Sequence, residues 1–78
     1  VLFRSDARIY AAELPAGTAI QREIAPDRYA WLQVVRGKVT LNSLALKEGD
    51  GAAVSNESEI VVASPTDSPG EVLLFDLP

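Results

Sequence analysis

Apolar and polar residues alternate along most of this chain, and turn-forming residues interrupt the alternation every few positions. Residues 7–14 place Tyr10, Ala12 and Leu14 on one face of an extended strand, and residues 18–24 repeat the pattern more weakly. A period of two is typical of half-buried β-strands, whereas an amphipathic helix repeats its apolar face every three or four residues. The pattern therefore predicts an all-β fold.

The strongest strand signal is "YAWLQVV" at residues 29–35, which is rich in aromatic and β-branched residues. Arg36 and Gly37 separate it from "KVTL" at residues 38–41. Two residues are the length of a tight hairpin loop, and glycine tolerates the positive φ that such a loop requires. We therefore expect a hairpin at Arg36 and Gly37.

Further short strands follow. Asn42 and Ser43 predict a second tight turn, because asparagine suits its first position. The remaining expected strands are residues 44–46, 52–55, 59–63 and 71–77. A total of about seven or eight short strands, with no helical segment, suits a small jelly-roll β-barrel built of Greek keys.

Length and charge limit what the chain can do. Its 78 residues allow one domain. The net charge is −4 with no basic cluster, which argues against nucleic-acid binding because phosphate contacts need gathered lysines and arginines. No apolar run reaches the roughly 20 residues of a membrane-spanning helix. We expect a cytoplasmic domain.

Residues 1–5, "VLFRS", permit two interpretations. They resemble the translated end of a widely used sequencing adapter, in which case they are not native and the true N-terminal portion is missing. Alternatively, they begin an ordinary apolar strand. Either way, we expect residues 6–78 to form the single domain.

Candidate chemistry is sparse. The chain has no histidine and no cysteine. Transition-metal sites in proteins draw on imidazole and thiolate ligands, and no serine here has a histidine to act as its base. An oxygen-only site for Mg²⁺ or Ca²⁺ from Glu23, Glu57 and Glu59 is conceivable. Solvated carboxylates explain these residues more simply, so we predict neither catalytic nor metal-binding residues.

Three residues on one face of the strand at 29–35 form the best candidate for a ligand-lining surface: Tyr29, Trp31 and Gln33. A half-apolar pocket with a few polar groups would suit an aromatic, flavonoid-like ligand. The simpler alternative, which we favour, is that Trp31 anchors the core. The opposite face is purely apolar: Ala30, Leu32 and Val34.

Four segments in this order and spacing resemble the C-terminal cupin of pirin-like bicupin proteins, some of which are described as quercetin 2,3-dioxygenases. They are "DARIYAAEL", "RYAWLQVVRGKVTLN", "LKEGDGAAVS" and the terminal "EVLLFDLP". The resemblance covers residues 6–78 and implies a cupin-type β-barrel. In that family the metal belongs to the N-terminal cupin. The resemblance therefore implies a divalent transition metal in that missing partner domain and no cofactor in this one.

Counted back from Gly37, the paired-histidine positions of that family's motif fall near Glu23 and Ala25. The resemblance thus implies a non-catalytic, metal-free half of a quercetin 2,3-dioxygenase-type oxidoreductase, which supports the N-terminal cupin by burying a shared interface. Alone, such a half should expose an apolar patch and self-associate as a homo-oligomer. Two alternatives stay open: a stand-alone barrel that binds a flavonoid-like small molecule, and a carrier domain modified on Lys38.

Overall fold

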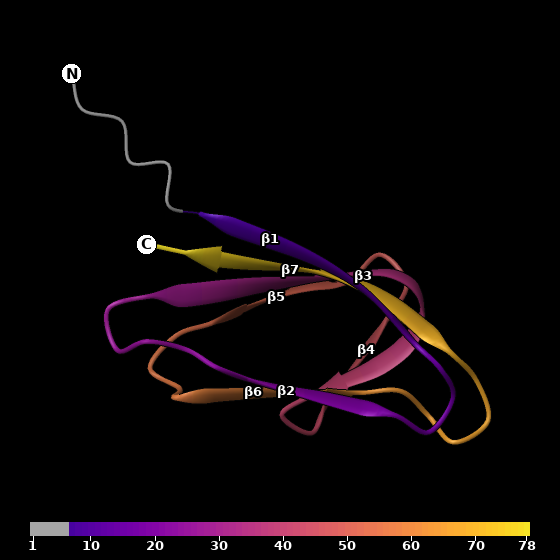
Figure 1. Ribbon diagram of the computed structural model, residues 1–78. Coiled ribbons are helices and arrows are strands. Elements are labelled where there is room, and N and C mark those ends of the chain that lie inside the picture. Colours follow the sequence, from indigo (N-terminus) through magenta and orange to yellow (C-terminus); the bar gives the residue numbers. More distant parts are fainter. Residues whose placement is uncertain (1–6) are drawn as a thin grey trace.

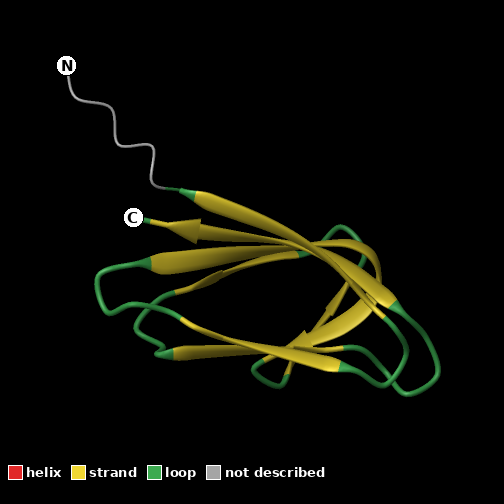
Figure 2. Ribbon diagram, in the orientation of Figure 1, coloured by secondary structure: helices red, strands yellow, loops and turns green. Residues whose placement is uncertain are grey.

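Seven β-strands make up the part of the chain that the structure, a computed structural model, describes, residues 7–78 (Figure 1). They are β1 (Arg8–Leu14), β2 (Ala19–Glu23), β3 (Tyr29–Leu41), β4 (Leu44–Lys47), β5 (Gly51–Val54), β6 (Glu59–Ala63) and β7 (Gly70–Leu77). Loops and turns join them, with no helix in the described range (Figure 2). The predicted all-β class is confirmed. The two interpretations of residues 1–5 fall outside the described residues.

The strands form two antiparallel sheets that share β3. In sheet A, the first half of β3 lies between β7 and β5, and β1 pairs with the other side of β7. In sheet B, the second half of β3 lies between β6 and β4, and β2 pairs with β6. The sheets face each other as the two layers of a jelly roll (Figure 1).

The hairpin expected at Arg36 and Gly37 is wrong, because β3 runs through both residues without reversing direction. Val34 pairs with β7 and so does Arg36, which leaves Val35 as the extra residue of a β-bulge. Gly37 has the expected positive φ, 74°. Here the positive φ belongs to a bend that carries β3 from sheet A into sheet B, since bulges kink a strand and increase its twist.

The bulge decides which residues of β3 face the interior. Before it the even-numbered residues are buried, as for Leu32 and Val34; after it the odd-numbered residues are buried, as for Val39 and Leu41. An inserted residue changes the face to which every later side chain points. Without the bulge, Lys38 would point into the core.

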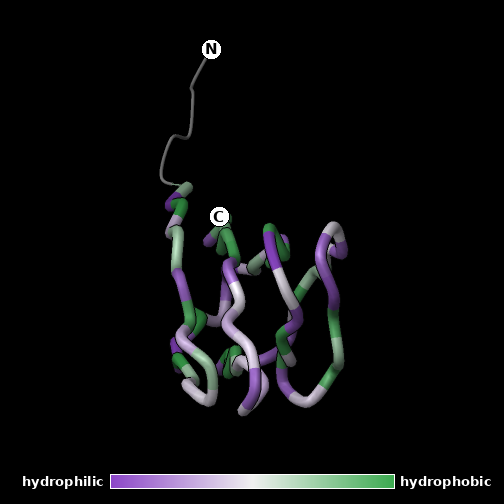
Figure 3. The backbone as a smooth tube through the Cα atoms, turned by 90° about the vertical axis from the view of Figure 1, so that its right-hand side faces the viewer, coloured by the Kyte–Doolittle hydropathy of each residue, from purple (hydrophilic) through white to green (hydrophobic). Residues whose placement is uncertain are grey.

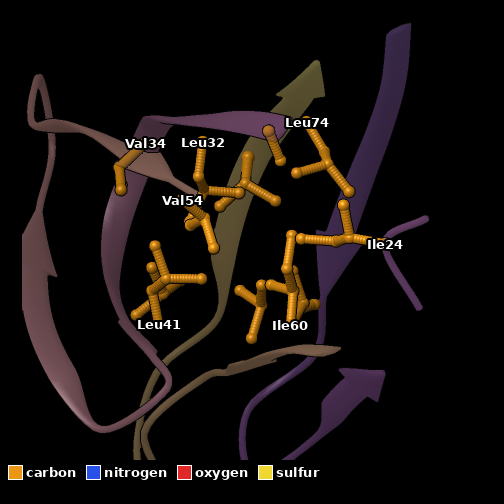
Figure 4. Packing of buried hydrophobic residues seen from close by; sticks show 12 residues of the cluster. Ile24, Leu32, Val34, Leu41, Val54, Ile60 and Leu74 are labelled. Atoms are coloured by element: carbon orange, nitrogen blue, oxygen red, sulfur yellow. The ribbon is translucent and has the colours of Figure 1, made fainter. Parts of the chain in front are cut away.

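The core between the sheets is aliphatic. Figure 4 shows its side chains converging from both layers. The buried members are Leu14, Ile24, Ala30, Leu32, Val34, Val39, Leu41, Val54, Ile60, Val62, Val72 and Leu74. Along the strands, buried residues alternate with more exposed ones, so one set of side chains fills this core. Figure 3 shows how hydrophobic and hydrophilic residues are distributed along the backbone.

The turn expected at Asn42 and Ser43 is confirmed. Both residues have positive φ, 46° and 73°, which is the signature of a type I′ hairpin turn. The Asn42 side chain also holds the neighbouring strand: its Oδ1 accepts a hydrogen bond from the Val61 amide at 2.8 Å, and its Nδ2 donates to the Glu59 carbonyl at 3.2 Å. Asparagine therefore serves both the turn and the pairing of β3 with β6.

The assigned core predicts that alanine substitutions at two leucines lower the free energy of unfolding by very different amounts. Leu32 is 0% exposed, so we expect Leu32→Ala to lower the free energy of unfolding by about 2–5 kcal/mol through lost burial and a residual cavity. Leu44, in β4, is 57% exposed, and Leu44→Ala should stay within about 0.5 kcal/mol of the parent chain. Urea unfolding followed by circular dichroism measures both. Equal losses would contradict the assigned core.

Candidate functional site

Side chains that point into the barrel do not fit a transition metal. The core residues are aliphatic and carry no nitrogen, oxygen or sulfur donor in their side chains. Glu23 and Ala25, near which the resemblance places the paired histidines, flank the buried Ile24 and are themselves exposed. Within residues 7–78, no three His, Cys, Asp or Glu residues gather in a group that could hold a metal ion.

Two of the three glutamates considered for an oxygen-only site are neighbours. Glu23 and Glu59 lie directly opposite each other in the pairing of β2 with β6. The Gln21 amide nitrogen donates a 2.6 Å hydrogen bond to the Glu59 carboxylate. Glu57 is exposed in the loop before β6, and the three do not form a metal-holding group in the described part of the chain.

The open end of the barrel, where β1 starts and β7 finishes, is polar. Arg28 Nε donates to the Asp76 carboxylate at 2.7 Å, and Arg28 Nη2 donates to the Asp76 carbonyl at 3.1 Å. Both side chains are 17% exposed. Nearby, the Arg22 guanidinium stacks on the Tyr10 ring, 3.7 Å from its centroid, and so joins β2 to β1, strands of opposite sheets. At this end, these contacts therefore join β7 to the loop before β3 by a charged pair and β2 to β1 by stacking.

This end also contains a hollow of about 780 Å³. Its charged lining residues are Arg8, Arg22, Arg28, Glu23, Glu59 and Asp76. The three cations and three carboxylates cancel, so the hollow has no excess charge to select an ionic ligand.

Trp31 is not a core residue, contrary to the interpretation that we favoured from the sequence. Its side chain is 39% exposed and lies on the outer face of sheet A, with Tyr29 and Gln33. Because successive side chains of β3 lie on opposite faces, the apolar residues that alternate with this trio, such as Leu32, point into the core instead. Five hollows in the part of the chain that the structure describes are lined by other residues. Ligand binding by this trio stays a prediction.

The Trp31 indole is fixed in place on that face. Its Nε1 donates to the Gln33 side-chain oxygen at 3.3 Å, and Gln33 Nε2 in turn donates to the Gly49 and Asp50 carbonyls at 3.1 and 3.2 Å. The indole lies over Gly51, where any Cβ would overlap its ring and come within 2.9 Å of Gln33 Oε1. The absence of a side chain at Gly51 therefore lets the indole lie flat on the sheet.

Around Trp31 the outer face of sheet A is apolar. In one cross-strand row, Ile9 pairs with Phe75, Phe75 with Trp31, and Trp31 with Ala53. We call the following eight residues the outer apolar face: Ile9, Ala11, Tyr29, Trp31, Ala53, Leu73, Phe75 and Leu77. All are exposed or half-buried, with Ile9 at 63%. Sheet A is therefore apolar on both sides, which is typical of sheets covered on both faces.

The outer side of sheet B has a different composition. Its polar residues are Gln21, Glu23, Lys38, Thr40, Lys47 and Glu59. The apolar residues among them are small, three alanines and Val61. Within the described residues, the outer side of sheet A therefore carries more large apolar side chains than that of sheet B, although Ile20 and Leu44 of sheet B are also exposed.

Comparison with known proteins identifies the family. The profile of the quercetinase C-terminal cupin domain matches residues 1–77. The chain belongs to the quercetinase C-terminal cupin domain family.

Curated relatives agree with this family assignment. The chain is 40% identical to quercetin 2,3-dioxygenase of Escherichia coli K12 and 33% identical to a pirin-like protein of Caulobacter vibrioides, in each case over 94% of this chain. It spans only 31% of the length of these two relatives. No helix in the described residues is long and apolar enough to cross a membrane.

Solved structures share the fold. A crystal structure of bacterial pirin YhhW from Escherichia coli in complex with nickel(II) has a TM-score of 0.86 and 40% identity over 94% of this chain and 31% of that one. A de novo designed double-stranded β-helix has a TM-score of 0.75 at 16% identity, covering 88% of this chain and 97% of that one. The predicted small cupin-type barrel is confirmed.

Substituting Gly51 tests how Trp31 is held. We expect Gly51→Ala to displace the indole, weaken its near-ultraviolet circular dichroism and shift its emission, because the new methyl group occupies the space of the ring. Trp31 is the single tryptophan of the chain, so its emission and the tryptophan bands of the circular dichroism spectrum report on it alone. Leu44→Ala in β4 is the control and should change neither signal. Unchanged spectra for Gly51→Ala would show that the indole does not lie over this glycine.

The Arg28–Asp76 contact predicts that removing the negative charge of Asp76 lowers the stability of the domain. Asp76→Asn keeps the shape of the side chain but removes the carboxylate that Arg28 binds. We expect the free energy of unfolding to fall by about 1–3 kcal/mol, the usual range for a half-buried hydrogen bond to a charged group. Asp67→Asn, in an exposed loop, should stay within about 0.5 kcal/mol. Urea titration compares them, and equal effects would contradict a structural role for the pair.

Proposed function

We propose that this domain is a non-catalytic, metal-free cupin half that stabilises a metal-binding cupin preceding it in the same protein. The observation that carries the proposal is the aliphatic interior, whose twelve clustered side chains have no donor atoms. A metal centre needs inward-pointing nitrogen, oxygen or sulfur ligands. Leu, Ile and Val in this space stabilise the fold by apolar burial, but their side chains cannot bind a metal.

The relatives support a larger parent protein. They extend far beyond the region that matches this chain, which covers 31% of their length. One relative is named for quercetin 2,3-dioxygenase activity, and one related structure for its complex with nickel(II). On our proposal, a divalent transition metal and an oxidoreductase activity of this type belong to the preceding cupin, in a cytoplasmic protein, and this chain turns over no substrate.

A supporting half needs a surface on which to act. The outer apolar face of sheet A supplies one, because burial of large apolar side chains drives association between domains. Flavonoid binding by the barrel and modification of Lys38 stay predictions.

The proposal predicts where metal is found. After the isolated chain is loaded with Ni²⁺ or Fe²⁺ and then dialysed, elemental analysis should find only substoichiometric metal. The longer protein should retain its metal, and deletion of residues 7–78 should lower the melting temperature of the remainder without removing its metal ligands. Stoichiometric metal in the isolated chain, or oxygen consumption by it with quercetin, would overturn the proposal.

A further inference from the structure

We propose that the outer apolar face of sheet A is the docking surface for the preceding cupin, and that Trp31 is its anchor. The inference rests on the proposed function for the identity of the occupant. It adds which surface is covered and which residue holds the partner. Nothing in the barrel interior or in its polar open end enters the argument.

Trp31 has the properties of an anchor. It is central in the cross-strand row from Ile9 to Ala53, with neighbours on both sides. Its hydrogen bond to Gln33 orients the indole, and the absence of a side chain at Gly51 leaves room for this position before any partner binds. Binding energy concentrates in a few central residues, tryptophan above all, and a side chain already held in place loses little entropy on binding.

The edges of this face also fit an interface. At one end of the outer apolar face lie Glu13 and Glu71, a cross-strand pair, with Arg36 opposite Glu71. Along another edge Gln33 is tied to the turn at residues 49–50. An apolar centre surrounded by polar and charged residues is the usual anatomy of a protein interface.

Chain connectivity favours the preceding domain over a second copy of this chain. β1 is the first strand of the described residues and an edge strand of sheet A, and its Ile9 already belongs to the outer apolar face. A domain tethered there has an effective concentration in the millimolar range. A second copy at micromolar concentration competes poorly with such a neighbour.

Hydroxyl-radical footprinting of the longer protein tests the surface directly. We expect the peptide containing Trp31 to be protected, although this side chain is 39% exposed in the domain alone, while Leu44 in sheet B stays reactive. Protection of Trp31 that persists on dilution to nanomolar concentration supports an intramolecular partner. A reactive Trp31, or protection that is lost on dilution as dimers dissociate, overturns the proposal.

Two variants test the anchor. We expect Trp31→Ala in the longer protein to raise the rate of proteolysis between the domains about tenfold or more, as loss of an interface hot spot does. Gly51→Ala retains the indole but displaces it and should give a smaller rise, while Leu44→Ala gives none. An unchanged rate for Trp31→Ala overturns the anchor. If Trp31→Ala has no effect but deletion of residues 7–78 still destabilises the preceding cupin, the supporting function stands and only the proposed docking surface is wrong. If neither Trp31→Ala nor the deletion has an effect, the docking surface and the supporting function are both wrong.

Discussion

The architecture depends on one strand, β3, which belongs to both sheets. Its bulge at Val35 and positive φ at Gly37 turn the strand from sheet A into sheet B. This bend brings β3 against the start of β7, where a Cβ on Gly37 would meet the Pro69 carbonyl at 2.5 Å. Only glycine satisfies both the conformation and the space. The two layers, and the interior between them, therefore depend on a single short stretch of backbone.

Strand alternation then determines both surfaces of sheet A at once. Once Leu32 points into the core, Trp31 must point out, because successive side chains of a strand lie on opposite faces. The same alternation fills the barrel with aliphatic side chains and gives the outer side the aromatic row of Trp31 and Phe75. The aliphatic interior without metal-ligating side chains and the apolar outer face of sheet A therefore both follow from the same alternation along the strands.

Sequence reasoning identified the strands and the barrel because both follow from local alternation and turn chemistry. It failed at Gly37, since a glycine with positive φ serves a hairpin and a bulge equally well and only long-range pairing with β7 distinguishes them. It also misplaced Trp31. Both faces of residues 29–35 are largely apolar, so hydrophobicity alone does not reveal which face is inward. The contact of the indole with Gly51 joins residues from two strands and has no local signal in the sequence.

On the proposed docking, the outer apolar face links the stability of this domain to that of its neighbour. A domain of 78 residues buries a modest core, so its free energy of unfolding is small. A partner that binds only the folded state adds RT ln(1 + [L]/Kd), which is about 4 kcal/mol when the effective concentration exceeds Kd a thousandfold. A tethered cupin at millimolar effective concentration reaches that ratio with only micromolar affinity. This gain is comparable to the whole margin of a small domain. On the proposed docking, linkage would stabilise the preceding cupin by the same amount, and this is how the proposed supporting half would contribute to the protein.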